Sequence, residues 1–249
     1  MHGHLTSLCV PIASTLLAAG LCSSPASAAP FKVYSPVVHS GEKAVEYSGY
    51  RDFDHRDGVD SSQTHKFAFE YGVNDVWATE VEVEFQKEGR GVLRDSAVAW
   101  ENRFQLNPQG RDWATVGVFV EYEFHTQSGG ADEVKLGPLL EWELNQKLSA
   151  TLNLFLERQI GSSAESGTVL AYGARLKYSA NRVFEPALEL FGEPGKIGHF
   201  PSRREQEHWI GPAVYGALSH HVKYRAALLF GTTEAASDKR AVLQLEYEL

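Results

Sequence analysis

Glutamates occupy every second position in one short stretch of the sequence, "EVEVEF". Glu80, Glu82 and Glu84 alternate there with apolar residues. In a β-strand alternate side chains project from the same face, and the outer two of these carboxylates would lie about 13 Å apart. A row of carboxylates attracts cations and discriminates between ions when it lines a narrow space. The spacing therefore predicts a cation-attracting strand face, provided that the fold encloses it.

Three sets of neighbouring serines and histidines raise the alternative of nucleophilic catalysis on an ester or acyl group. They are Ser62 with His65, Ser128 with His125, and Ser219 with His220 and His221. Such chemistry needs a serine within hydrogen-bond reach of its base. Adjacent residues in a strand or tight turn point in different directions, and closeness in sequence does not establish a triad. We keep an acyl hydrolase as an alternative and predict no enzyme and no catalytic residue.

Histidines and aspartates near the ends of the regular segments raise the question of a metal site. The residues concerned are His55, His65, His125, His199, His208, Asp52, Asp54 and Asp57. Their spacing does not repeat a ligand pattern, and "DFDHRDGVD" lacks the glutamate that closes a calcium loop. We predict no metal site and no cofactor.

The composition excludes several classes of protein. The chain has 249 residues, 43% of them hydrophobic, with 23 Lys and Arg against 32 Asp and Glu. A net charge of −9 provides no basic surface for nucleic acid. No apolar run reaches the roughly 20 residues that a transmembrane helix needs. The length permits one large β domain or two small ones.

The first residues have the features of a secretory signal peptide. An apolar, uncharged run, "LCVPIASTLLAAGLC", is followed by the small residues of a signal-peptidase site in "SSPASAAP". We expect a signal peptide over residues 1–28 with cleavage near Ala28; an N-terminal helix of the mature fold is the alternative. Cys9 and Cys22 both lie in this region. The mature chain would then have no disulfide, thiolate metal site or cysteine nucleophile.

From about residue 43 onward the apolar residues recur with a period of two. The stretches "VEVEF", "VEYEF" and "LEYEL" place aromatic or aliphatic residues on one face and glutamates on the other. Turn residues interrupt this pattern about every 10 residues, which predicts about twelve strands. The expected strands span residues 43–53, 64–72, 77–87, 94–106, 113–125, 133–144, 148–158, 168–178, 183–192, 207–218, 222–231 and 240–249.

The connections between these strands alternate between short and longer polar segments. Short ones include "GVND", "NQK" and "SHH", and longer ones include "DHRDGVDSSQ" and "EPGKIGHFPSRRE". Outer-membrane barrels have short periplasmic turns, longer external loops and an even number of strands. We therefore predict an all-β, single antiparallel up-and-down transmembrane β-barrel over residues 43–249. Residues 29–42 are expected to form a periplasmic N-terminal extension.

A period of two alone does not distinguish a membrane barrel from a soluble one. A soluble barrel buries its apolar face, whereas a membrane barrel turns that face toward lipid. Strands of this length can cross a bilayer when tilted, and aromatic residues near the short turns match an interfacial girdle. These aromatics are Tyr71, Trp77, Phe104, Trp113 and Trp142. We favour the membrane barrel and keep a soluble periplasmic binding barrel as an alternative.

In a membrane barrel the charged face would line the lumen. The residues expected to determine its selectivity are Glu80, Glu82, Glu84, Glu121, Glu123, Glu141, Glu143, Arg175, Lys177, Lys223 and Arg225. These charges either line a conducting or gated pore or pair with one another and fill the interior. We favour the pore, because Gly117, Gly137 and Gly173 on the same face leave space.

The last residues, "LQLEYEL", continue the alternation to Leu249. A final strand that pairs with the first closes a barrel without leaving an edge. Leu245, Tyr247 and Leu249 resemble the C-terminal assembly signal of bacterial outer-membrane barrels, with leucine replacing the more usual terminal phenylalanine. The resemblance implies recognition by the barrel-assembly machinery.

Two longer stretches resemble known barrel proteins. "VYSPVVHSGEKAVEYSGYRD" is similar to the opening of uncharacterised proteobacterial barrels. "GPAVYGALSHHVKYRAALLFGTTEAASDKRAVLQLEYEL" resembles the C-terminal half of the phenol-degradation-pathway (MetA-type) family. This resemblance covers most of the mature chain and implies an outer-membrane transporter of small, often aromatic molecules. No catalytic residue transfers from it.

The expected location is the outer membrane of a Gram-negative bacterium. The expected partners are outer-membrane lipids and lipopolysaccharide, the barrel-assembly machinery and a small-molecule solute. Arg203 and Arg204 lie in a long loop, where guanidinium groups would contact lipopolysaccharide phosphates or gate the lumen.

Overall fold

Twelve antiparallel strands form where apolar and polar residues alternate. The computed structural model describes residues 31–110 and 112–249. The strands are β1 (Lys43–Phe53), β2 (Gln63–Asn74), β3 (Trp77–Lys87), β4 (Arg94–Gln105), β5 (Thr115–His125), β6 (Asp132–Asn145), β7 (Leu148–Ile160), β8 (Val169–Tyr178), β9 (Glu185–Lys196), β10 (Glu207–Ala217), β11 (Val222–Gly231) and β12 (Lys239–Glu248). The predicted set of strands is confirmed, and the predicted signal peptide lies outside the described residues.

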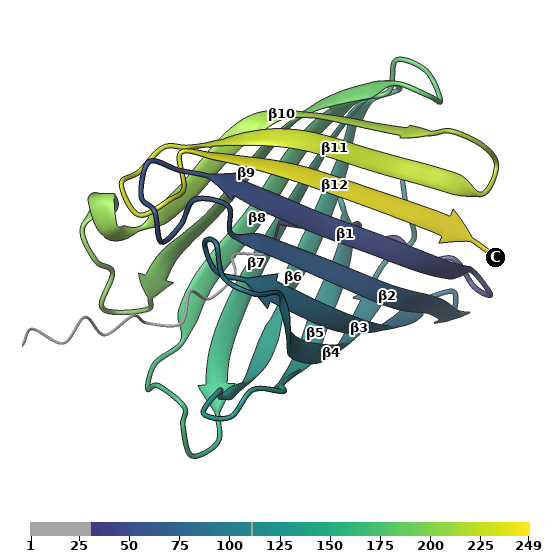
Figure 1. The fold of residues 1–249 in the computed structure, drawn as a ribbon. Coiled ribbons are helices and arrows are strands. Elements are labelled where there is room, and N and C mark those ends of the chain that lie inside the picture. Colours follow the sequence, from purple (N-terminus) through teal and green to yellow (C-terminus); the bar gives the residue numbers. More distant parts are fainter. Residues whose placement is uncertain (1–30, 111) are drawn as a thin grey trace, which may run out of the picture.

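Each strand pairs with its neighbours in sequence, and β12 returns to pair with β1 (Figure 1). The closing pair is in continuous register, with Tyr47 opposite Leu245 and Val45 opposite Tyr247. Leu249 extends it by donating its backbone N–H to the Lys43 carbonyl at 2.9 Å. The sheet therefore has no free edge, and the predicted up-and-down barrel is confirmed.

Two details differ from the sequence-based expectation. β9 runs on to Lys196, because a bulge beside Leu170 and Tyr172 of β8 accommodates Pro194, which has no N–H to donate. The β4–β5 connection, residues 106–114, is as long as the longer loops although it lies at the short-turn end. The Asn107 side chain links the two ends of this connection, because it accepts from the Val116 N–H at 2.7 Å and donates to the Ala114 carbonyl at 2.8 Å. The β8–β9 connection at the same end, residues 179–184, also matches the length of the loops at 88–93 and 126–131, so the expected alternation of loop lengths has two exceptions.

The outer surface of the barrel is apolar and its interior is polar. On β3, Val81 and Val83 are 53% and 42% exposed, whereas Glu80 and Glu82 between and beside them are 3% exposed. Further exposed apolar residues are Val45, Phe67, Phe69, Trp100, Tyr122, Phe124, Leu136, Leu154, Leu156, Leu176, Leu188, Leu228, Phe230, Leu243 and Leu245. So large an apolar surface is not stable in water but matches a lipid environment. Within the described residues, no helix is long and apolar enough to cross a membrane.

Aromatic side chains gather at the end that holds the short turns. Trp77 stacks on Phe104 with ring centroids 6.2 Å apart, and Trp113 packs against Trp142 at 5.9 Å. Trp113 is 74% exposed. This arrangement agrees with the predicted interfacial girdle, since indole rings favour the boundary between lipid and water.

The exposed end of β12 leads to a prediction about assembly. Leu249 is 67% exposed and continues the β1–β12 pairing. A charge there costs up to about 1 kcal/mol near the interface and more at greater depth. Leu249→Asp is therefore expected to reduce the folded fraction in outer-membrane preparations, and Leu249→Phe to assemble at least as well as the original chain. Heat-modifiable migration on gels measures that fraction; normal assembly of Leu249→Asp would contradict the prediction.

Candidate functional site

The row of glutamates predicted on one strand lies inside the barrel, where cationic groups neutralise it. Lys66 of β2 contacts Glu82 at 2.7 Å and Glu84 at 3.0 Å. Glu80 is paired with Lys32 at 3.1 Å. All three carboxylates are nearly inaccessible to solvent, and buried charges of this kind persist only when they are paired.

The carboxylates farther round the wall follow the same pattern. Glu121 is 3.1 Å from Lys135 of β6, and Glu123 lies 3.6 Å from the His125 imidazole. Three of the predicted residues have looser contacts near the short-turn end: Arg175 is 3.6 Å from Glu141, and Glu143 accepts a hydrogen bond from Gln109 at 3.1 Å. The predicted acidic residues therefore share one face, with the deeper ones buried and Glu143 exposed.

The basic residues predicted on β8 and β11 also face the lumen. Arg225 forms two hydrogen bonds to Glu189, at 2.8 and 2.6 Å. Lys177 contacts Glu185 at 2.9 Å. Lys223 is half-exposed beside the carboxylates of β12, 3.0 Å from Glu246. The interior is thus lined by ion pairs across neighbouring strands, and the role of these residues in selectivity remains a prediction.

Residues 31–38 lie inside the barrel, whereas the sequence led us to expect a periplasmic extension. Phe31 is buried among aromatic rings, 5.2 Å from Tyr50, 5.3 Å from Phe191 and 5.0 Å from Trp209. Its carbonyl accepts a hydrogen bond from Arg225 at 2.7 Å. We call residues 31–38 the lumen segment, because both its apolar side chains and its backbone contact the barrel wall.

Side chains of the barrel wall form hydrogen bonds with the backbone N–H and carbonyl groups of the lumen segment. Asn153 of β7 accepts from the Tyr34 N–H at 2.8 Å and donates to the Tyr34 carbonyl at 2.9 Å. Arg103 donates to the Ser35 carbonyl at 3.1 Å, and Gln105 accepts from the Val38 N–H at 2.9 Å. An extended chain without a neighbouring strand needs such partners, so the wall is built to hold this segment.

Inward glycines and aromatic residues accommodate the lumen segment. A β-carbon on Gly117 would come within 2.9 Å of the Pro36 β-carbon, and one on Gly173 within 3.3 Å of the Phe191 ring. Phe119 packs on Tyr34 with ring centroids 4.6 Å apart. The space predicted beside Gly117 and Gly173 therefore exists, but protein groups fill it. At Gly137 the missing side chain instead leaves room for the Leu154 carbonyl.

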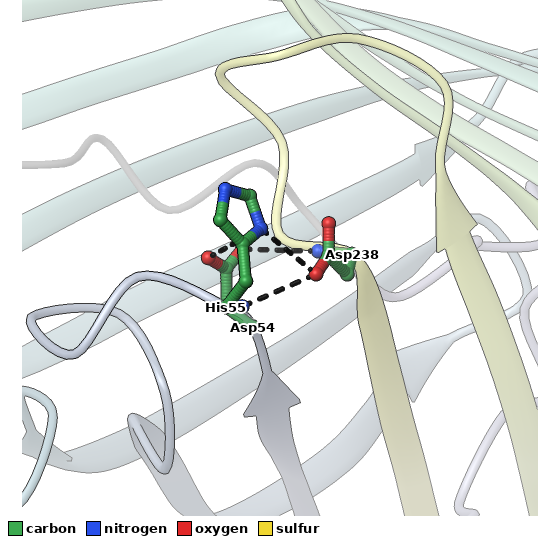
Figure 2. A group of neighbouring side chains, drawn as sticks. All are labelled: Asp54, His55 and Asp238. Carbon is green, nitrogen blue, oxygen red and sulfur yellow. Dashed lines mark hydrogen bonds and ion pairs between the residues drawn. The ribbon is translucent and has the colours of Figure 1, made fainter.

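The long-loop end contains a separate cluster of polar side chains, formed by Asp54, His55 and Asp238 (Figure 2). His55 contacts Asp238 through its ring nitrogen at 3.0 Å, and the Asp238 N–H donates to Asp54 at 3.1 Å. Arg56 binds both oxygens of Asp54, each at 2.8 Å. Arg56 also donates to the carbonyl of Ala236, so these contacts tie the β1–β2 loop to the β11–β12 loop.

The remaining histidines of the candidate metal set are not brought to this group. His65 is hydrogen-bonded to Tyr47 and Gln63, and His208 to Tyr172 and Gln206. Within the described part of the chain, no serine hydroxyl is hydrogen-bonded to a histidine ring. His221 contacts the Glu248 carbonyl. The Ser–His neighbours of the sequence therefore do not form a nucleophile–base pair in this structure.

The contact between Asp54 and Arg56 leads to a prediction about how the local stability of these loops depends on pH. Hydrogen bonds from the Arg56 guanidinium and from backbone N–H groups lower the pKa of Asp54 to about 2. A carboxyl with a lowered folded-state pKa stabilises above its unfolded value of about 3.9, and loses that contribution as the pH falls through the folded value. The protection of the Asp238 amide, taken as the ratio of its intrinsic to its observed hydrogen-exchange rate at each pH, should therefore be constant down to about pH 4 and decrease toward pH 2. Arg56→Ala should shift that decrease to higher pH; an unchanged midpoint would contradict the assignment.

The long loop predicted to meet lipopolysaccharide carries its arginines on the surface. Arg203 and Arg204 begin a short 3-10 turn, η1 (Arg203–Glu205). Arg204 is 3.5 Å from Glu234, and both side chains are largely exposed. The arginines are therefore accessible from outside the barrel, and their contact with phosphate groups remains a prediction.

Solved structures show the same fold. The NanC porin has 13% sequence identity and a TM-score of 0.59, over 83% of this chain and 100% of that one. The KdgM porin has 8% identity and a TM-score of 0.59, over 83% and 99%. An outer membrane channel from Pseudomonas putida F1 has 15% identity and a TM-score of 0.58, over 85% and 97%. At these identities the likeness establishes the fold alone.

Sequence comparison gives no family assignment. No family model matches the chain, and no curated protein matches it. The general expectation of a small outer-membrane-type barrel is thus supported by its structural neighbours. The resemblance to the MetA-type family stays a prediction.

Proposed function

We propose that this protein is an outer-membrane channel for small solutes whose lumen segment closes it in the present structure. The observation that carries this proposal is a charged lumen, inside a lipid-facing barrel, crossed by a segment that belongs to no strand. Lys32, Tyr34 and Arg225 link that segment to the wall by polar contacts, which water or a solute can replace. The segment also packs by apolar contacts, with Phe31 and Val33 in one buried cluster and Tyr34 in another, and these contacts favour the closed state.

The charge of the lining supports a preference for cations over anions. Glu46, Glu80, Glu82 and Glu101 gather on β1, β3 and β4, and all four are buried. A narrow enclosed space screens such charges less than an open surface does. The KdgM porin, by contrast, was solved in complex with oligogalacturonate. We place the short turns and the C-terminal end of β12 on the periplasmic side, and infer lipids, lipopolysaccharide and the assembly machinery as partners.

The two alternatives have less support. An acyl hydrolase needs a serine beside its base, and the described Ser–His neighbours are not so arranged. A soluble binding barrel needs a polar outer surface, whereas here the exposed side chains of β3 are apolar. The MetA-type resemblance adds small aromatic molecules as a solute class, to be tested beside inorganic ions.

Planar-bilayer recording of the refolded protein tests the channel. We expect brief openings from a closed baseline, with a reversal potential under a salt gradient that indicates cation preference. Glu80→Gln, Glu82→Gln and Glu84→Gln together should bring the permeability ratio of cation to anion toward one, because they remove the buried acidic row.

The matched control for this triple variant is Glu165→Gln, whose carboxylate is paired with Lys196 in an exposed loop. It should leave the permeability ratio unchanged. A triple variant that conducts with unchanged selectivity would show that the acidic row does not act on passing ions. A correctly folded original chain with no openings under any salt or voltage would contradict the channel itself.

A further inference from the structure

The lumen contains a cluster of carboxylates. Part of the positive charge that neutralises this cluster comes from a residue outside the sheet. We call Glu46, Glu80, Glu82 and Glu101 the carboxylate cluster. Oxygens of Glu80, Glu82 and Glu101 all lie within 4.8 Å of one another, and these three residues are at most 3% exposed. Ionised carboxylates this close and this dry need a cation between them.

Lys32 of the lumen segment supplies that cation. Its ammonium group is 3.0 Å from Glu46 and 3.1 and 3.3 Å from the two oxygens of Glu80. It also lies 5.1 Å from the centre of the Tyr34 ring, within the range of a cation–π contact. Lys66, which neutralises Glu82, is fixed on β2. Lys32 is held only by the lumen segment and can leave with it.

The carboxylate cluster also has hydrogen-bonding capacity that the chain does not use. One oxygen of Glu101 accepts from the Tyr34 hydroxyl at 3.1 Å. Its other oxygen, Oε2, is buried and has no hydrogen-bond partner among the described residues, and Glu101 is 2% exposed. An unpaired buried carboxylate oxygen is costly. It is therefore an acceptor that points to an additional donor.

We propose that the carboxylate cluster is a binding subsite for the ammonium group of a small organic amine, with Lys32 as its built-in occupant in the closed state. This proposal rests on the channel function proposed above, and it names the solute class. A primary ammonium has three donors and no acceptor, which matches a site composed of carboxylate oxygens. An amine that enters would replace both the charge and the hydrogen bonds that Lys32 takes away.

The test uses n-butylamine, which reproduces the lysine side chain without its backbone. Full-length Lys32→Ala protein, refolded in detergent, should bind one n-butylamine by calorimetry. The original chain should bind it at least about tenfold more weakly, because its subsite is occupied for most of the time. Adding Glu101→Gln to Lys32→Ala should weaken binding. Lys196→Ala, which removes an exposed lysine paired with Glu165, should create no site.

Several outcomes would overturn the proposal. They are no binding to Lys32→Ala, equal binding of the uncharged n-butanol, equal binding to Lys196→Ala, or binding of Ca²⁺ without binding of n-butylamine. If Lys32→Ala does not refold alone, refolding is repeated with n-butylamine, since a ligand of the folded state stabilises it. Rescue by the amine supports the subsite, and failure with the amine present counts against it.

Binding and conduction are measured separately, so the two proposals can fail independently. Calorimetry on the refolded protein requires no current. Binding without any channel openings would refute the proposed channel and leave the subsite. Openings with no amine binding to Lys32→Ala would refute the subsite and leave the channel.

Discussion

Removing residues 31–38 should convert a mostly closed barrel into one that conducts steadily. The original chain should be open for about 0.1–10% of the time, the usual population of a minor conformation. Without the segment, the contacts of Phe31 and Tyr34 with the wall are lost, and water can occupy the space between the ion pairs. Planar-bilayer recordings of both proteins measure the open fraction. A folded deletion variant with the same closed baseline would contradict the role of the segment.

A reversible lock provides the control for that experiment. Pro36 and the β-carbon position of Gly117 are 2.9 Å apart, which is somewhat closer than the roughly 3.8 Å of a disulfide. A cysteine at position 117 would also bring its β-carbon within 2.9 Å of the Phe104 carbonyl oxygen, so cross-linking of cysteines at these two positions requires a shift of the β4–β5 backbone as well as of the segment. Because both natural cysteines, Cys9 and Cys22, lie in the predicted signal peptide, no other thiol would compete in the mature chain. The oxidised double variant should remain closed, and a reductant should restore its openings.

The buried pair between Glu189 and Arg225 should have the largest effect on stability. The side chains of Glu189 and Arg225 are 0% and 3% exposed, and their closest contact is 2.6 Å. Glu189→Ala leaves the Arg225 guanidinium in the interior without its carboxylate. Breaking a buried pair in this way costs about 3–5 kcal/mol. Urea unfolding in lipid vesicles should show the corresponding fall in the free energy of unfolding.

An exposed pair of the same chemistry serves as the comparison. Lys196 and Glu165 are 2.8 Å apart, with side chains 41% and 51% exposed. Glu165→Ala should change the free energy of unfolding by only about 0–1 kcal/mol, because water screens the pair and solvates the remaining charge. Similar losses for Glu165→Ala and Glu189→Ala would show that burial does not set the strength of the pair at Glu189.

The strands could be predicted because their signal is local. From Glu80 to Glu84 the polarity of each residue indicates which face of the strand it occupies. The alternation continues along the strand because one face contacts lipid and the other faces a charged interior. The end of β9 was not predictable in this way. Pro194 and Gly195 are turn residues by local preference, but a bulge against Leu170 retains them in the strand. The end of β9 is therefore set by its pairing with β8 and not by local sequence preference.

The lumen segment could not be placed from local patterns, because its partners are distant in sequence. Tyr34 is held by Asn153 and packs on Phe119. One signal was available: Phe119, Phe155 and Phe191 occupy positions that share a face with charged residues, and all three are fully buried. Large aromatic residues on the polar face of a membrane barrel need a partner inside the lumen. That observation predicts a segment in the interior but not which segment it is.

The direct connection from the lumen segment into β1 determines how easily a solute can compete with it. The segment is covalently continuous with β1, and just before that strand the Gly41 N–H donates to the Gly72 carbonyl at 2.8 Å. The segment therefore cannot diffuse away from the barrel when it is released. A short tether keeps a group at an effective concentration on the order of millimolar. Any solute that uses the same contacts competes with this intramolecular ligand. At low external concentration the barrel therefore recloses behind each molecule, and the flux rises once the solute concentration approaches that of the tethered group.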